Sequence, residues 1–231
     1  MKAATYGNIE VVRYLAEHCG ADVNAMNETG DTALMGAVYS GSTEVVRYFT
    51  EACGVDVSAV VMEGDTALMK AASYGRIEVV RYLAERCRAD VNTRSKDGDT
   101  ALMKAAGYGR IDVVRYLIAE CGADFNTPNK DGDTALMKAA SYGIAVVRYL
   151  IEGCGADVNA MSLNGDTALM KATSYGDIEV VQYLAEECGA DANATNKDGY
   201  TAVMWAAYSG EIEIVEYLAE QCGADVNSMN T

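Results

Sequence analysis

The chain has 231 residues, of which half are apolar, and a formal net charge of −16. This charge repels the phosphates of nucleic acids and of anionic membrane surfaces, so we expect neither as a partner, whereas a basic protein or peptide would be attracted. We also expect no membrane span, because no apolar run reaches about 18 residues, and no signal peptide, because no apolar core follows Lys2.

A pattern of 34 residues recurs along the whole chain, and its clearest copy is GDTALMKAASYGRIEVVRYLAERCRADVNTRSKD, residues 64–97. A fixed period of this size is typical of a solenoid, in which each unit buries its apolar face against its neighbours. We therefore expect residues 1–231 to form one domain. Its parts are a partial repeat, 1–29, and the repeats 30–63, 64–97, 98–131, 132–164, 165–198 and 199–231.

Each repeat reads as two helices and a turn. In residues 64–97, Thr66 can cap the helix formed by ALMKAASY, and Asp65 places negative charge near the positive end of its dipole. Gly75 suits the left-handed conformation that ends such a helix. Residues 77–87 continue with apolar side chains on one helical face, and residues 89–98 are rich in turn formers.

The motif G-x-T-A-L-M-x-A-A-x-x-G, followed by V-V-x-Y-L and G-A-D-V-N, resembles ankyrin repeats over essentially the whole chain. The resemblance implies an all-α solenoid of about seven stacked units, each a helix–turn–helix pair with a projecting β-hairpin turn. Three features depart from the family. Ala67 stands where the family usually has a proline. Met69 stands where the family usually has a histidine, and the period exceeds the usual length of about 33 residues, which predicts a slightly longer second helix.

Three repeats are irregular. Residues 1–29 begin inside the first helix, so Met1 is either a true start or a cut through a longer array. Repeat 132–164 lacks one residue after Gly143, which predicts a shortened turn between its helices. In the last repeat Trp205 replaces a lysine and Glu216 an arginine, as expected of a polar C-terminal cap.

The sequence contains no catalytic or cofactor motif. The only histidine, His18, is adjacent to Cys19, and neighbouring helical side chains diverge by about 100°, so the two do not form a dyad. No CxxC pair, HExxH or glycine-rich phosphate loop is present. We therefore expect neither an enzyme nor a bound metal or cofactor.

All seven cysteines occupy one repeat position, near the end of the second helix. Stacked helices lie roughly 8–10 Å apart, whereas a disulfide needs Cα atoms within about 7 Å, so neighbouring repeats should not be cross-linked. Free thiols favour a reducing compartment. We expect the cytoplasm, with the nucleus or the cytoplasm of a host cell left open.

Tyrosines end the first helix of every repeat. The candidate partner-binding residues among them are Tyr39, Tyr74, Tyr108, Tyr142, Tyr175 and Tyr208. The ankyrin resemblance places these positions on the concave groove, where rigid aromatic rings would anchor a partner. The alternative is a stacked tyrosine ladder that only joins repeats, and both hypotheses stand. A second set of tyrosines, in the second helix, is expected to pack in the core.

Other candidate contacts are Trp205 and two charged columns. The columns contain Lys70, Lys104 and Lys138, and Asp65, Asp99 and Asp133. The charged side chains either meet a partner or pair with one another. The last candidate is the apolar fingertip Val60, Val61 and Met62, which is either a contact site or packed on a neighbouring turn.

These observations favour a non-catalytic, monomeric scaffold that binds a partner protein or extended peptide on its concave groove and hairpin tips. Affinity would come from a few tyrosine anchors on a pre-organised surface. The alternatives are a structural array without a dedicated ligand, engineered or recently duplicated, and the recognition module of a larger protein.

Overall fold

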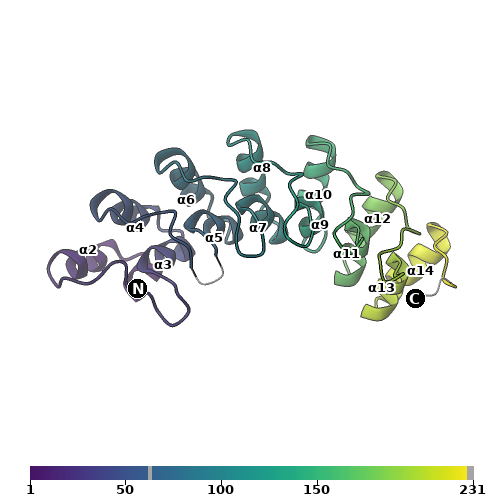
Figure 1. Ribbon diagram of the computed structural model, residues 1–231, viewed down its shortest axis with the longest axis horizontal. Helices are drawn as coiled ribbons and strands as arrows, with labels where there is room; N and C mark the ends of the chain where they lie inside the picture. Colours follow the sequence, from purple (N-terminus) through teal and green to yellow (C-terminus); the bar gives the residue numbers. More distant parts are fainter. Residues whose placement is uncertain (62–63, 228–231) are drawn as a thin grey trace. The chain divides into compact units, whose positions relative to one another are not determined.

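The computed structural model describes residues 1–61 and 64–227 (Figure 1). Met62, the last residue of the apolar fingertip, lies outside this part of the chain. The first helices of the repeats are α1 Lys2–Thr5, α3 Ala33–Ser40, α5 Ala67–Ser73, α7 Ala101–Gly107, α9 Ala135–Ala139, α11 Ala168–Tyr175 and α13 Ala202–Ser209. The second helices are α2 Ile9–Glu17, α4 Thr43–Arg47, α6 Ile77–Arg81, α8 Ile111–Ala119, α10 Ile144–Arg148, α12 Ile178–Gln182 and α14 Ile212–Gln221.

Four of the second helices continue directly into a π-helical turn. These turns are η1 Tyr48–Ala52, η2 Tyr82–Arg86, η3 Tyr149–Gly153 and η4 Tyr183–Glu187. In η2 the Cys87 N–H reaches back to the Tyr82 carbonyl oxygen at 3.3 Å, five residues earlier. A wider turn accommodates one more residue than an α-helical turn. The longer second helix stays a prediction, because repeat 98–131 has the same period and its α8 is not followed by a π-helical turn.

The chain forms two compact units, each built from helix pairs. The first unit comprises Met1–Ala105 and Asp112–Ala123, and the second comprises Ala106–Ile111 and Asp124–Thr231. Among the described residues there is no strand, which establishes the all-α solenoid of about seven repeats. No helix in that part of the chain is both long and apolar enough to cross a bilayer.

The first helices begin as the sequence predicts. The Thr66 hydroxyl accepts a hydrogen bond from the Met69 N–H at 3.3 Å, and the equivalent threonines cap α3, α7, α9, α11 and α13. Met69 is almost fully buried, as are Met35, Met103, Met137 and Met170 at the same repeat position, whereas Met1 of the partial first repeat is exposed. The methionine that replaces the family's histidine therefore fills the core. Gly41 adopts a left-handed conformation, with φ of 76°, that ends α3.

The missing residue of repeat 132–164 shortens a helix and not the turn, so that prediction was wrong. α9 ends at Ala139, whereas the equivalent α7 has two more residues, and four residues still separate α9 from α10. Val146 and Val147 of α10 keep the fully buried positions of their counterparts. Because α10 keeps its place, Gly143 serves both as the end of the turn and as the N-cap, with φ of 127°.

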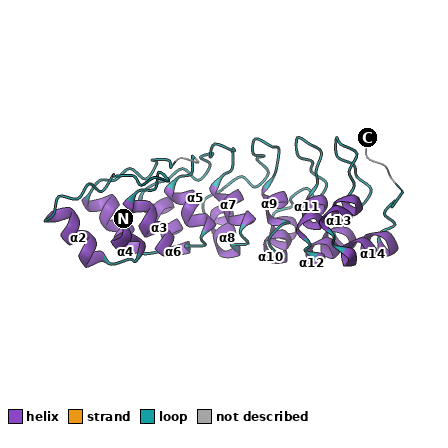
Figure 2. Cartoon of the chain, turned by 90° about the horizontal axis from the view of Figure 1, so that it is seen from below, coloured by secondary structure: helices purple, strands orange, loops and turns teal. Residues whose placement is uncertain are grey.

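The segments expected as β-hairpins are tight turns, which project from the helix layers as the loops of Figure 2. In one of them the Ser95 N–H donates to the Asp99 carbonyl oxygen at 2.9 Å, and the Gly98 N–H to the Ser95 carbonyl at 3.0 Å. The turn beginning at Asn27 has the same two bonds. These bonds close the turn, but the two arms form no further ladder and hence no strand.

The second-helix tyrosines Tyr48, Tyr82, Tyr116 and Tyr183 pack between repeats, as predicted, but Tyr14 of the partial first repeat is 60% exposed, against the prediction. In the first unit the Tyr82 hydroxyl donates to Glu51 at 3.1 Å, and in the second unit the Tyr183 hydroxyl donates to Glu152 at 2.8 Å. Both rings are buried. Each hydrogen bond joins a tyrosine to a glutamate 31 residues earlier, so neighbouring repeats are linked by a polar contact inside an apolar interface.

Candidate functional site

In the first unit, two tyrosine rings lie beside one another at the ends of α3 and α5. The ring centroids of Tyr39 and Tyr74 are 5.1 Å apart, and the Tyr74 side chain is 48% exposed. The Tyr39 hydroxyl donates to Asp31 at 2.5 Å. The Arg76 guanidinium donates to the Tyr39 carbonyl oxygen at 2.8 Å. These contacts fix the pair while leaving aromatic surface open.

In the second unit, three consecutive tyrosines form what we call the tyrosine strip: Tyr108, Tyr142 and Tyr175. The ring of Tyr142 lies 5.9 Å from that of Tyr108 and 6.0 Å from that of Tyr175. Each ring is more than half exposed. The rings therefore contact one another, as expected of a tyrosine ladder, and also face solvent, as expected of anchors for a partner.

The last repeat of the second unit begins with an aromatic cluster before and within α13. The Trp205 ring lies 5.3 Å from Tyr200 and 6.0 Å from Tyr208, which meets it edge-on. Tyr208 is 79% exposed, whereas Trp205 is partly covered. Tyr200 and Trp205 occupy the positions of the aspartate and lysine of other repeats, so aromatic contacts replace an ion pair here.

The aspartate and lysine candidates are bound to one another. In the first unit the Lys104 ammonium lies 3.4 Å from Asp65 and 3.4 Å from Asp99, and Lys70 lies 2.9 Å from Asp65. Burial by itself lowers the pKa of Lys104, but the two carboxylates outweigh it and raise that pKa. The ammonium thus stays charged between two neighbouring repeats.

The second unit repeats this arrangement. Lys138 lies 3.6 Å from Asp133, and Lys171 bridges Asp133 and Asp166 at 3.5 and 3.4 Å. Both carboxylates are largely buried. The candidate lysines and aspartates therefore pair with one another within and between repeats, and they offer a partner little free charge.

The two described residues of the apolar fingertip differ in solvent exposure. Val60 is 52% exposed, whereas Val61 is buried and donates its N–H to the Asp65 carbonyl oxygen at 3.1 Å. Of the two described residues, only Val60 offers apolar surface to a partner.

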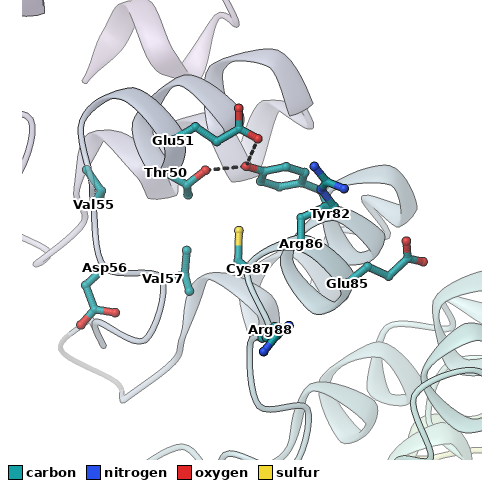
Figure 3. Close-up of a pocket in the computed structure, with 10 residues that line it drawn as sticks. All are labelled: Thr50, Glu51, Val55, Asp56, Val57, Tyr82, Glu85, Arg86, Cys87 and Arg88. Carbon is teal, nitrogen blue, oxygen red and sulfur yellow. Dashed lines mark hydrogen bonds between the residues drawn. The ribbon is translucent and has the colours of Figure 1, made fainter.

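The first unit also has a hollow that was not predicted from the sequence, at the ends of η1 and η2 (Figure 3). Its volume is about 560 Å³, and Thr50, Tyr82, Arg86, Cys87 and Arg88 are among the residues that line it. Two signals were present in the sequence. Arg86 stands where no other repeat has a lysine or an arginine, and Arg88 replaces a glycine.

The described residues contain no group of three or more histidine, cysteine, aspartate or glutamate side chains placed to hold a metal ion. All seven cysteines are free.

A family model described as ankyrin repeats, in three copies, matches residues 1–95, 53–129, 87–162 and 136–230. No curated protein matches the chain.

Proposed function

Because the chain belongs to the ankyrin-repeat family, whose repeats are generally protein–protein interaction modules, we propose that it is a non-catalytic scaffold that binds an extended peptide segment of a partner protein. The tyrosine strip of the second unit is the proposed anchor. The Tyr39–Tyr74 pair of the first unit offers the same kind of surface. Members of this family are typically non-catalytic, which agrees with the proposal.

The observation that carries the proposal is the combination of contact and exposure in the strip. Tyr108, Tyr142 and Tyr175 are held at ring distances of 5.9 and 6.0 Å, yet each is more than half exposed. Tyrosine rings that are fixed in advance lose little conformational entropy when a partner binds. Such rings supply large apolar contact area with a polar end, as at interface hot spots.

The charge of the last two repeats favours a basic partner. Residues 165–198 contain two basic and seven acidic side chains, and residues 199–231 contain five acidic and no basic ones. Basic side chains of a peptide would be attracted to this region and would also stack on exposed aromatic faces. We therefore propose a peptide that combines apolar and basic residues. The free thiols favour a reducing compartment such as the cytoplasm as its place of action.

The test is selection of peptides from a displayed library against the whole protein, followed by fluorescence anisotropy with the selected sequences. The decisive variant is Tyr108→Ala/Tyr142→Ala/Tyr175→Ala. The control is Tyr14→Ala, which removes a tyrosine of similar exposure in α2 of the first unit. We expect the triple variant to lose binding while its circular dichroism is unchanged and the control binds normally. Equal binding by the wild type and a folded triple variant would reject the strip as the site.

A second candidate function is a structural array without a dedicated ligand, and the ring contacts themselves favour it. If this is correct, library selection yields no peptide. The triple variant then unfolds at a clearly lower temperature than the wild type, because the rings act as a joint between repeats.

A further inference from the structure

The hollow of the first unit is lined by residues that depart from the repeat pattern. Thr50 stands where other repeats have alanine or isoleucine, and Val55 stands where they have alanine. Arg86 and Arg88 are equally exceptional in their own repeat. In a chain of closely similar repeats, four departures at one hollow mark it as different from the equivalent places in other repeats.

One of these departures has a conformational cost. Arg88 has φ of 54° and is the only non-glycine residue with positive φ in the described part of the chain. The equivalent positions of the other repeats are Gly20, Gly54, Gly122, Gly155, Gly189 and Gly223, all of positive φ. A side chain in the left-handed region is less stable than glycine there. The guanidinium at this position is therefore retained at the expense of stability.

The carboxylates around the hollow have their own donors. Glu51 accepts the Tyr82 hydroxyl at 3.1 Å, and Glu85 accepts the Tyr116 hydroxyl at 2.9 Å. Asp56 accepts the hydroxyl and the N–H of Ser58, and these hydrogen bonds lower its pKa.

The two guanidinium groups at the hollow, by contrast, have no partner in the described part of the chain. Arg86 and Arg88 are exposed, and neither contacts a carboxylate, carbonyl or aromatic ring within residues 1–61 and 64–227. Of the two repeats that line the hollow, 30–63 has one basic and five acidic side chains, whereas 64–97 has seven basic and five acidic ones. Repeat 64–97 is the only one with a positive balance in a chain of net charge −16.

From this placement we propose that the hollow binds an acidic peptide segment of a partner protein, at a surface separate from the tyrosine strip. Arg86 and Arg88 flank Cys87 in the sequence, and all three line the hollow (Figure 3). A ligand that meets both guanidiniums carries two negative groups some distance apart, as an acidic peptide does. Val55 and Val57 line another side and provide apolar contact for one of its side chains.

The first test measures binding of a short fluorescein-labelled peptide of alternating glutamate and leucine, by anisotropy at low ionic strength. The variant Arg86→Ala/Arg88→Gly restores the glycine of the other repeats and removes both charges. The control Lys130→Ala/Lys197→Ala removes two exposed charges from turns of the second unit. We expect about tenfold weaker binding for the arginine variant, from two partly screened ion pairs, and little change for the control. Equal weakening by both variants would overturn the proposal, because it would show only the effect of net charge.

The second test uses Cys87 as a reporter of position. Neutral iodoacetamide alkylates the thiols, and mass spectrometry follows each of the seven cysteines, which occupy the same repeat position. We expect the glutamate peptide to slow alkylation of Cys87 but not of Cys121 or Cys154. If the peptide protects no thiol, or all of them equally, the hollow is not its site. If polyuridylate or phosphatidylserine vesicles bind with the same dependence on the two arginines and the peptide does not, the assignment to an acidic peptide is wrong.

Discussion

The hydroxyl of Tyr116 donates a 2.9 Å hydrogen bond to Glu85, 31 residues earlier in the chain, and the Arg81 guanidinium lies over the same ring at 4.7 Å from its centre. One tyrosine thereby connects two neighbouring repeats of the first unit through a buried hydroxyl, a carboxylate and a cation. Three further pairs in the described residues, Tyr48–Glu17, Tyr82–Glu51 and Tyr183–Glu152, have the same spacing. Polar contacts of this kind hold each repeat in a defined position against its neighbour.

Replacing Tyr116 by phenylalanine should destabilise the protein. The change removes only a hydroxyl but leaves Glu85 without that donor, so we expect a loss of about 1–2 kcal/mol in the free energy of unfolding. Tyr175→Phe is the matched control because the Tyr175 ring is exposed, and it should cost less than about 0.5 kcal/mol. Urea denaturation followed by circular dichroism measures both. Equal losses would show that the Tyr116–Glu85 bond has no particular role.

Stability should fall at alkaline pH. Burial, together with a hydrogen bond to Glu17, raises the pKa of Tyr48 to about 12. Burial also raises the pKa of Tyr82 to about 12. In the unfolded chain both phenols ionise near pH 10. Above about pH 10 the folded state therefore keeps protons that the unfolded state has lost. The contribution of these two phenols to the free energy of unfolding is complete below about pH 10 and is lost as the pH approaches 12.

The measurement is the urea midpoint between pH 8.5 and 11.5, a range chosen around the ordinary phenol pKa of about 10. The double variant Tyr48→Phe/Tyr82→Phe should show a flatter decline than the wild type over this range. Raised pKa values of Cys121, Cys154 and Cys188, each due mainly to burial, act in the same direction and remain in the variant. A wild-type midpoint that stays constant up to pH 11.5 would contradict the expectation.

Lys104 should stabilise the stacking of its repeat on the preceding one. The Lys104→Met change keeps much of the side-chain volume but leaves Asp65 with Lys70 alone and removes an ammonium from Asp99. Because the two carboxylates are largely buried, we expect a loss of about 1–3 kcal/mol. Lys130→Met, at an exposed turn of the second unit, is the control and should change stability by less than about 0.5 kcal/mol. Indistinguishable denaturation curves would mean that the ion pairs only offset their own desolvation.

Much of this fold follows from the repeated sequence, and the failures have identifiable causes. Thr66 and Gly75 mark helix ends because their local chemistry is independent of the rest of the chain. The missing residue after Gly143 was placed wrongly because tertiary packing keeps Val146 and Val147 in position, and local rules do not include that packing.

The candidate site was predictable only in part. Tyr142 is exposed and its ring also contacts two neighbouring tyrosines. It therefore fits both the partner-binding surface and the tyrosine ladder, which the repeat pattern of the sequence alone cannot distinguish. The ion pairs of Lys104 depend on an aspartate of another repeat. The hollow beside Arg86 and Arg88 arises from two repeats together, so its lining could not be assembled from either one.

The strain at Arg88 gives a prediction with an unusual sign. Arg88→Gly should stabilise the protein by about 0.5–1 kcal/mol, since glycine adopts a φ of 54° without the steric cost that a side chain meets there. Part of the gain is offset by the greater freedom of glycine in the unfolded chain. Arg88→Ala removes the same charge but keeps a Cβ atom, so it should leave stability near that of the wild type. Urea denaturation of the three proteins separates the two effects. If both variants are equally stabilised, the gain comes from removing a charge and not from relieving backbone strain. The positive φ of Arg88 would then not lower the stability of the protein.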